Sequence, residues 1–195
     1  MKVWRRPAIL ASLAILGVAV GANAAFGNLL WLGYSLAGLA MYVTTVVLDH
    51  RMGWHLPERL YAWCGLPLAM HYLGGSLAGL HHWGTNGLYY ALPWWDNLVH
   101  FLACGAVGVA AAFVLAPRLP RRAGMVVLLA TSVAATAGVL IEFYEFVGFL
   151  WFHTVDQGYY TNTVLDLYYN ALGGFAGAWL WMRPARSRRA AVTPL

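Results

Sequence analysis

The stretch GMVVLLATSVAATAGVLIEFYEFVGFL, residues 124–150, carries two charged side chains, Glu142 and Glu145, in an otherwise uncharged run. A helix needs about 20 mainly apolar residues to cross the hydrocarbon core of a bilayer, so this run is long enough. Its apolar residues are continuous and do not alternate with polar ones, which favours a helix over a strand of a β-barrel. The stretch therefore predicts a membrane-spanning helix with two acids inside the membrane.

The composition of the whole chain supports the same class of protein. Hydrophobic residues make up 61% and charged residues 10% of the 195 residues, and the mean hydropathy is +0.62. Soluble domains have about a quarter of their residues charged, so a soluble fold is excluded. Cys64 and Cys104 lie in apolar runs without a CxxC partner. This argues against a disulfide framework or a thiolate zinc site and favours two small core residues.

Apolar runs along the chain predict an all-α, polytopic bundle with about six spans. Connections are short and show no repeat or low-complexity tract, so we expect one integral membrane domain over residues 1–195 with a basic tail at 183–195. The first run also resembles a cleavable signal peptide, but its apolar core is at the long end for one, which favours a retained helix. The predicted spans are roughly 8–24, 29–48, 59–80, 97–117, 124–150 and 164–182.

Basic residues occupy both termini and alternate connections of the chain. The connections at 25–28, 81–96 and 151–163 have none. The positive-inside rule therefore places both termini in the cytoplasm and these three connections outside a cell membrane. The net charge of +5 thus reflects topology, and scattered arginines without a recognition motif argue against nucleic-acid binding. The twelve basic residues of the chain are Lys2, Arg5, Arg6, Arg51, Arg59, Arg118, Arg121, Arg122, Arg183, Arg186, Arg188 and Arg189.

Five of the seven acids fall in the outward half of this topology, where there is no lysine or arginine. The other two, Asp49 and Glu58, flank a basic connection, and we expect Arg51 and Arg59 to balance them. Asp96 and His100 are four residues apart and share a helix face. The last span begins with polar residues at similar spacing. The predicted polar site consists of Asp96, His100, Glu142, Glu145 and Asp166, with Asp156, Thr163 and Asn170 in support.

The depth of the glutamates makes this site costly unless something compensates the charge. A rise of about 1.5 Å per residue places Glu145 roughly 7 Å and Glu142 roughly 12 Å below the outer end of their helix. A carboxylate inside the membrane costs about 2.5–3.5 kcal/mol on insertion scales. Protonation, hydrogen bonds to Asn170, Thr163 and tyrosine hydroxyls, or a bound cation would offset it. A ligand set of oxygen and nitrogen suits zinc, manganese or iron, and an all-oxygen set suits magnesium or calcium.

Helix capping is the alternative explanation for some of these residues. Asp96 is suited to the N-cap of its span, and Thr163 with Asp166 resembles a capping box. Glu142, if protonated, is able to bond to a neighbouring helix. Caps do not explain the polar residues that lie deeper in the helices, so we expect one shared site. His71, in contrast, fits a buried hydrogen-bonding role.

Three motifs, WDNLVHF, GVLIEFYEF and DQGYYTNTVLDLYYNALGG, resemble in order the motifs of the VanZ-like and YjdF-like membrane protein families. The resemblance covers about residues 94–177 and implies a role in the cell envelope without supplying a reaction. Two departures are that Asn97 replaces a VanZ-like lysine and that the arginine expected before the final aspartate is absent. The VanZ-like motif positions correspond here to Asp96, His100, Phe101, Glu142 or Glu145, Asp166, Asn170 and Gly173. The YjdF-like layout is matched by Gln157, Gly158, Thr163 and Asp166, and Asn162 departs from it.

Three classes of function are compatible with these observations. The first is a membrane enzyme or binding protein for a lipid or envelope component, with a metal or protonated carboxyl group in the site and His100 or Glu145 as acid or base. The second is a small proton- or cation-coupled transporter. The third is an assembly protein without chemistry. We favour the first because the acids crowd one leaflet, while the sequence leaves open whether a reaction is catalysed.

Overall fold

The computed structural model describes residues 6–76, 87–152 and 160–183, and every element in these ranges is a helix. The predicted all-α class is thus confirmed. A short helix, α4, interrupts a stretch that the sequence predicts as an outer connection. The helices are α1 (Pro7–Ala25), α2 (Leu29–Met52), α3 (Glu58–Ser76), α4 (Leu88–Ala91), α5 (Trp95–Leu115), α6 (Ala123–Phe152) and α7 (Tyr160–Met182).

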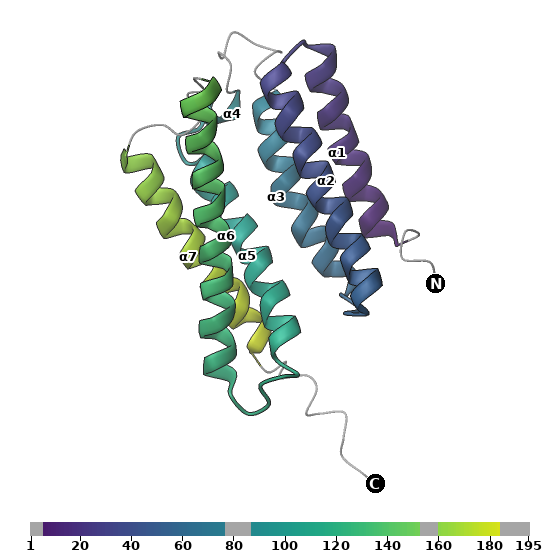
Figure 1. The fold of residues 1–195 in the computed structure, drawn as a ribbon, viewed down its shortest axis with the longest axis vertical. Coiled ribbons are helices and arrows are strands. Elements are labelled where there is room, and N and C mark those ends of the chain that lie inside the picture. Colours follow the sequence, from purple (N-terminus) through teal and green to yellow (C-terminus); the bar gives the residue numbers. More distant parts are fainter. Residues whose placement is uncertain (1–5, 77–86, 153–159, 184–195) are drawn as a thin grey trace.

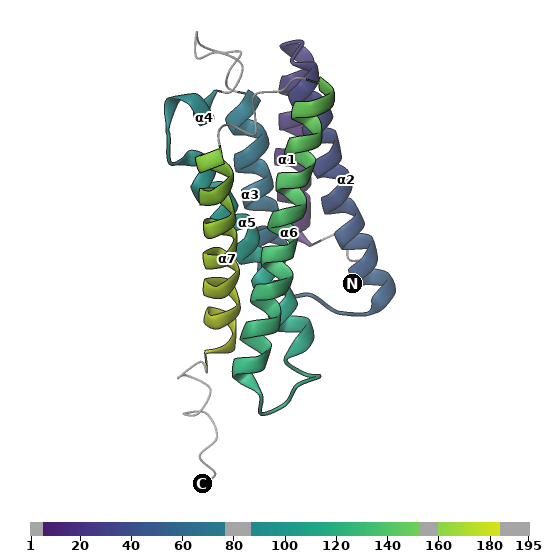
Figure 2. The same ribbon diagram turned by 60° about the vertical axis from the view of Figure 1, so that its left-hand side comes forward.

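The six long helices form two groups of three that lie side by side. Helices α1, α2 and α3 form one group, and α5, α6 and α7 form the other (Figure 1). Contacts between α3 and α5 join the groups. Successive long helices run in opposite directions, and Figure 2 shows α7 beside α5 and α6 along its length. The starts of α5 and α7 therefore lie at the same end of the molecule as the end of α6.

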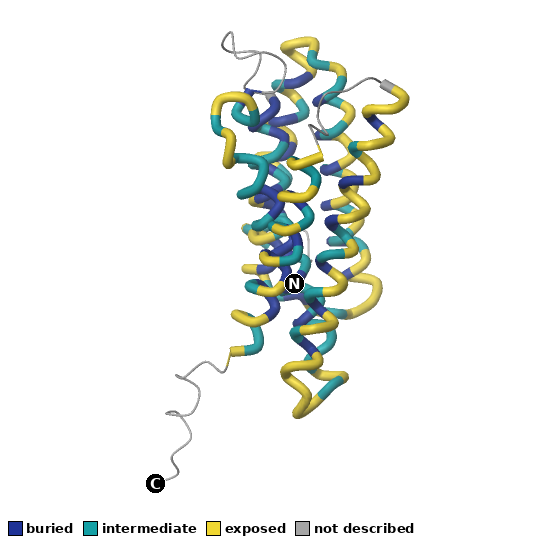
Figure 3. The backbone as a smooth tube through the Cα atoms, turned by 90° about the vertical axis from the view of Figure 1, so that its left-hand side faces the viewer, coloured by how far each residue is buried: buried dark blue, intermediate teal, exposed yellow. Residues whose placement is uncertain are grey.

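Four of the described helices are long and apolar enough to cross a membrane: α1, α2, α5 and α6. Helix α3 includes Glu58, Arg59 and His71, and α7 begins with a run of polar and aromatic residues, so neither is among these four. Exposed residues run along the outer faces of the bundle (Figure 3). Many are large and apolar, such as Leu128, Leu140 and Phe143, each 61% exposed. A surface of this kind suits contact with lipid.

The arginines of the described chain gather at one end of the bundle. Arg6 precedes α1, Arg51 ends α2, and Arg183 follows α7, and the direction of each helix brings these points together (Figure 1). We call this the arginine end and the opposite end, where α5 and α7 begin, the site end. The arginine end contains Arg6, Arg51, Arg59, Arg118, Arg121, Arg122 and Arg183.

Asp49, at the arginine end, has different partners from those that the sequence predicted. It is 3% exposed, and it accepts hydrogen bonds from the Tyr61 hydroxyl and, at 3.0 Å, from the backbone N–H of Leu56. No ion pair to Arg51 occurs among the described residues. The expectation that Arg51 balances this acid is therefore wrong. Glu58 likewise accepts from the backbone N–H of Ala8, at 3.0 Å, which ties the start of α1 to α3.

Helices α5 and α7 pack with their backbones close together because glycines face each other. A Cβ added at Gly177 would meet the carbonyl group of Gly105, and one at Gly173 would meet that of Phe101. A Cβ at Gly108 would likewise meet the carbonyl group of Gly174. Small residues at membrane helix interfaces allow this close approach and strengthen van der Waals contact. The close packing brings the side chains at the two helix starts within reach of each other.

Replacing Gly177 with alanine tests this packing. The new methyl group has to displace the backbone of α5, so we expect the free energy of unfolding to fall by about 1–3 kcal/mol. The measurement is an unfolding titration of the purified protein in mixed detergent micelles. Gly21→Ala in α1 is the control, because nothing lies within 4 Å of a Cβ there. Equal effects of the two substitutions would contradict a close α5–α7 contact.

Candidate functional site

The start of α5, the outer part of α6 and the start of α7 enclose a group of polar side chains at the site end. Asp96 is the second residue of α5, whose N-cap is Trp94, so Asp96 does not cap this helix. Helix α7 begins at Tyr160, which puts Thr163 inside the helix. The two capping interpretations are therefore wrong. The side chains of Asp96 and Asp166 instead turn toward a histidine.

The imidazole of His100 lies at the centre of this group. Its Nε2 atom is 3.4 Å from Oδ1 of Asp96 and 4.0 Å from Oδ1 of Asp166. One ligand atom from each of these three residues lies within 4.8 Å of the others. His100 is 5% exposed and Asp166 is fully buried. Two helices thus place two carboxylates and one imidazole nitrogen around a common point.

Asn170 determines which nitrogen of His100 faces the acids. Its Oδ1 atom is 3.1 Å from Nδ1 of His100 and accepts a hydrogen bond from the Cys104 thiol at 3.0 Å. An amide oxygen accepts only, so Nδ1 of His100 carries a hydrogen and donates it. In a neutral imidazole the lone pair is then on Nε2, which faces Asp96 and Asp166. Cys104 is consequently a partner in the site as well as the small core residue that the sequence predicts.

Asn162 links the two aspartates from the other side. Its Nδ2 atom donates to Oδ2 of Asp166 at 2.7 Å and to Oδ2 of Asp96 at 3.2 Å. Asn162 departs from the YjdF-like layout and was not among the predicted site residues. Asn162 lies four residues before Asp166, which places both on one face of α7. This spacing was the feature of the sequence from which its role in the site could have been predicted.

Glu142 is the deepest acid of the group and has no hydrogen-bond partner. It is 4% exposed, and neither of its carboxyl oxygens is bonded among the described residues. Oε1 of Glu142 is 3.8 Å from Nδ1 of His100, on the opposite side of the ring from the aspartates. Oδ1 of Asp166 also lacks a hydrogen bond. A buried, unpaired carboxylate is costly, so these oxygens require protonation, a bound cation or a partner beyond the described residues.

The other predicted site residues are less closely involved. Glu145 is half-buried and lies close enough for an electrostatic interaction with His100, without an ion pair to it within the described ranges. Thr163 is half-buried on the first turns of α7. Asp156 lies outside the described residues, as do His81, His82 and His153. His71, as expected, is hydrogen-bonded, and its partner is the Tyr89 hydroxyl.

Positive charge from arginine or lysine is absent from the described part of this site. All ion pairs within the described ranges involve His100 and one of Asp96, Glu142 and Asp166. The arginines lie at the opposite end of the bundle. The site therefore combines three acids with one imidazole, and a cation or additional protons are needed to balance it.

Substituting Asn170 with leucine tests its position beneath His100. The change removes the acceptor of the Nδ1 hydrogen, and leaving that buried donor unpaired should cost about 1–3 kcal/mol of unfolding free energy. The control is Thr136→Val, because this exposed hydroxyl bonds only to Ser132 of its own helix. The double variant Asn170→Leu with His100→Leu should show coupling of at least about 0.5 kcal/mol. Strictly additive effects would contradict a direct contact.

No curated protein and no solved structure matches the chain. A family described as predicted membrane protein (DUF2238) matches residues 6–187, which is nearly the whole chain, so the protein belongs to this family.

Proposed function

We propose that this protein binds a divalent metal ion through Asp96, His100 and Asp166, and that this site binds or acts on a lipid or another cell-envelope component. The observation that carries the proposal is the position of Nε2 of His100, which lies against the carboxylates of both aspartates. Nε2 faces Oδ1 of Asp96 at 3.4 Å and Oδ1 of Asp166 at 4.0 Å. If Nε2 is deprotonated, its lone pair faces both carboxylates, and a cation between the three side chains would offset the repulsion.

The geometry of these atoms supports a metal ion as that cation. Two ligands about 2.1 Å from a tetrahedral ion lie roughly 3.4 Å apart, which is close to the separation of Asp96 and His100. Small side-chain movements would bring Oδ1 of Asp166 to the same distance from Nε2 of His100. Asn170 acts as the outer partner that orients a metal-binding histidine through its other nitrogen. Asn162 orients both aspartates in a similar way.

The chemistry of the ligands narrows the choice of metal. Two carboxylate oxygens and one imidazole nitrogen suit zinc, manganese or iron, and magnesium would rely more on the oxygens. Three protein ligands leave a coordination position for a substrate, and a bound ion would polarise a phosphate or ester oxygen there. His100 is then a ligand, so Glu142 or Glu145 is left to accept or donate a proton.

The orientation of the protein supports an extracytoplasmic role. We infer six spans, with α3 and α7 crossing the membrane beside the four more apolar helices, and both termini in the cytoplasm. The seven described arginines at one end favour that end as cytoplasmic. The site then opens toward the outer leaflet. The resemblance to VanZ-like and YjdF-like proteins also favours a role in the envelope. The residues that carry the resemblance, Asp96, His100, Asp166 and Asn170, lie together.

Elemental analysis of gently purified protein tests the metal site. We expect about one divalent ion per chain in the wild type and its loss in Asp166→Asn and in His100→Gln. Asp49→Asn is the matched control, because Asp49 is also buried, at 3% exposed, but lies at the arginine end. Circular dichroism should show that all three variants keep their helices. Wild-type protein that is folded and free of metal would contradict the proposal.

A proton- or cation-coupled transporter is the second candidate, and Glu142 favours it. His100 lies between this deep, unpaired carboxyl group and the aspartates nearer the site end. A series of carboxyl, imidazole and carboxyl groups is able to pass a proton along the bundle.

Uptake of protons or cations into proteoliposomes under a pH gradient tests this second candidate. If the protein is a transporter, wild type should show uptake and Glu142→Gln should abolish it, because glutamine does not exchange a proton. Glu58→Gln at the arginine end is the control and should keep the wild-type rate. Absence of uptake in the wild type, or full uptake in Glu142→Gln, would exclude this route.

A further inference from the structure

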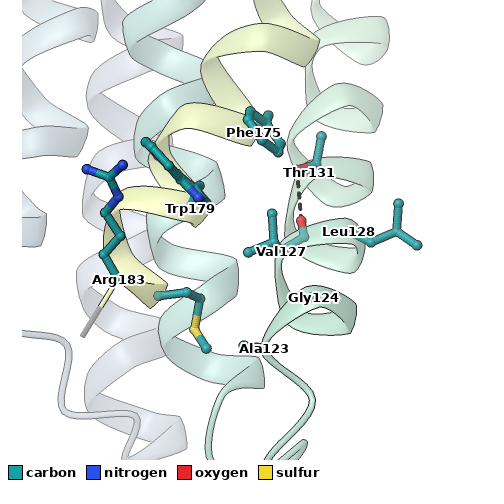
Figure 4. Close-up of a pocket in the computed structure, with 9 residues that line it drawn as sticks. Ala123, Gly124, Val127, Leu128, Thr131, Phe175, Trp179 and Arg183 are labelled. Carbon is teal, nitrogen blue, oxygen red and sulfur yellow. Dashed lines mark hydrogen bonds between the residues drawn. The ribbon is translucent and has the colours of Figure 1, made fainter.

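A groove lies between α6 and α7 near the arginine end, away from the site formed by Asp96 and His100. It has a volume of about 530 Å³, and Figure 4 shows the side chains that line it. Its lining residues belong to the first three turns of α6 and the last three turns of α7, together with Arg183, which follows α7. None of them takes part in the proposed metal site, so the groove calls for a separate explanation.

The walls of the groove are apolar and open to the surroundings. Val127 and Leu128 form the α6 side, and Leu128 is 61% exposed. Phe175 and Trp179 form the α7 side, with stacked rings whose centres are 6.4 Å apart. Thr131 of α6 also lines the groove, but its hydroxyl already donates to the carbonyl oxygen of Val127 at 2.8 Å (Figure 4). The walls therefore suit a hydrocarbon chain.

Positive charge borders the groove at the arginine end. Arg183 lies one helical turn beyond Trp179, and its guanidinium carbon is 3.5 Å from the centre of the Trp179 ring. A stacked guanidinium keeps its N–H edge available for an anion. Ala123 and Gly124, the first two residues of α6, line the same groove, so the positive end of a long helix dipole adds to this charge. No acid lines it.

We propose that this groove binds one anionic glycerophospholipid, with an acyl chain between α6 and α7 and the phosphate group at Arg183. Charge complementarity selects this ligand. A zwitterionic lipid brings its own cation close to the phosphate, which weakens the attraction to the arginine. A small soluble anion leaves the apolar walls uncovered. Because α6 meets the criteria for a membrane span, the groove lies where lipids are at hand. Basic residues at the ends of membrane helices attract anionic lipids in general, and the groove adds a defined position to this attraction.

Native mass spectrometry of the full-length protein tests the proposal. Phosphatidylglycerol should bind about tenfold more tightly than phosphatidylcholine with the same acyl chains, a difference of about 1.4 kcal/mol. Arg183→Gln should reduce phosphatidylglycerol binding to the phosphatidylcholine level. Arg51→Gln is the control, because Arg51 is exposed at the same end but lies on α2. Equal binding of the two lipids, or equal losses in the two variants, would overturn the proposal.

Two further measurements separate the groove from general charge attraction. Nothing lies within 4 Å of a Cβ built at Gly124, so Gly124→Leu should fold normally and fill the groove with its side chain. We expect this variant to lose the preference for phosphatidylglycerol while keeping its unfolding midpoint. Glycerol phosphate at millimolar concentration should not compete with the lipid. Wild-type lipid preference in Gly124→Leu, or displacement of the lipid by glycerol phosphate, would contradict an acyl-chain site.

Discussion

The contact between His100 and the amide of Asn170 is the interaction on which the site depends. The amide oxygen of Asn170 accepts a hydrogen bond from Nδ1 of His100, so Nε2 is directed at Asp96 and Asp166. In water, solvation of the carboxylates and the imidazole would stabilise such an arrangement. Inside a membrane bundle, charge that is not compensated is costly, and the carboxylates have no arginine or lysine near them. The polar group is therefore stable only if a cation or shared protons complete it.

Close packing of α5 against α7 makes this contact geometrically possible. Gly105 and Gly177 let the two backbones approach, which brings the side chains at the helix starts together. Gly138 on α6 adds to this, because a Cβ there would meet the Asn170 amide. The glycines thus determine the site indirectly by setting the distances between helices. Changes in the packing of these helices should therefore alter the surroundings of His100.

The sequence predicts the helices and the side-chain faces of the site more fully than it predicts individual contacts. Helical spacing indicates that Asp96 and His100 share a face, and the polar start of α7 indicates the same for Asp166 and Asn170. Contacts between helices depend on how each helix is rotated about its axis, which spacing within one helix does not determine. Asn162 was therefore left without a role, and Asp49 was assigned to Arg51, its neighbour in sequence, although Tyr61 on the next helix is its partner.

The state of the His100 imidazole is the most direct test of the account. Nitrogen-15 NMR of histidine-labelled protein in lipid bilayers, with His100→Gln used to assign the signals, reports each ring nitrogen separately. The account predicts that Nδ1 carries a hydrogen before and after chelation, and that the Nε2 signal moves when the metal is removed. An Nδ1 without hydrogen, or an Nε2 signal that chelation leaves unchanged, would contradict it.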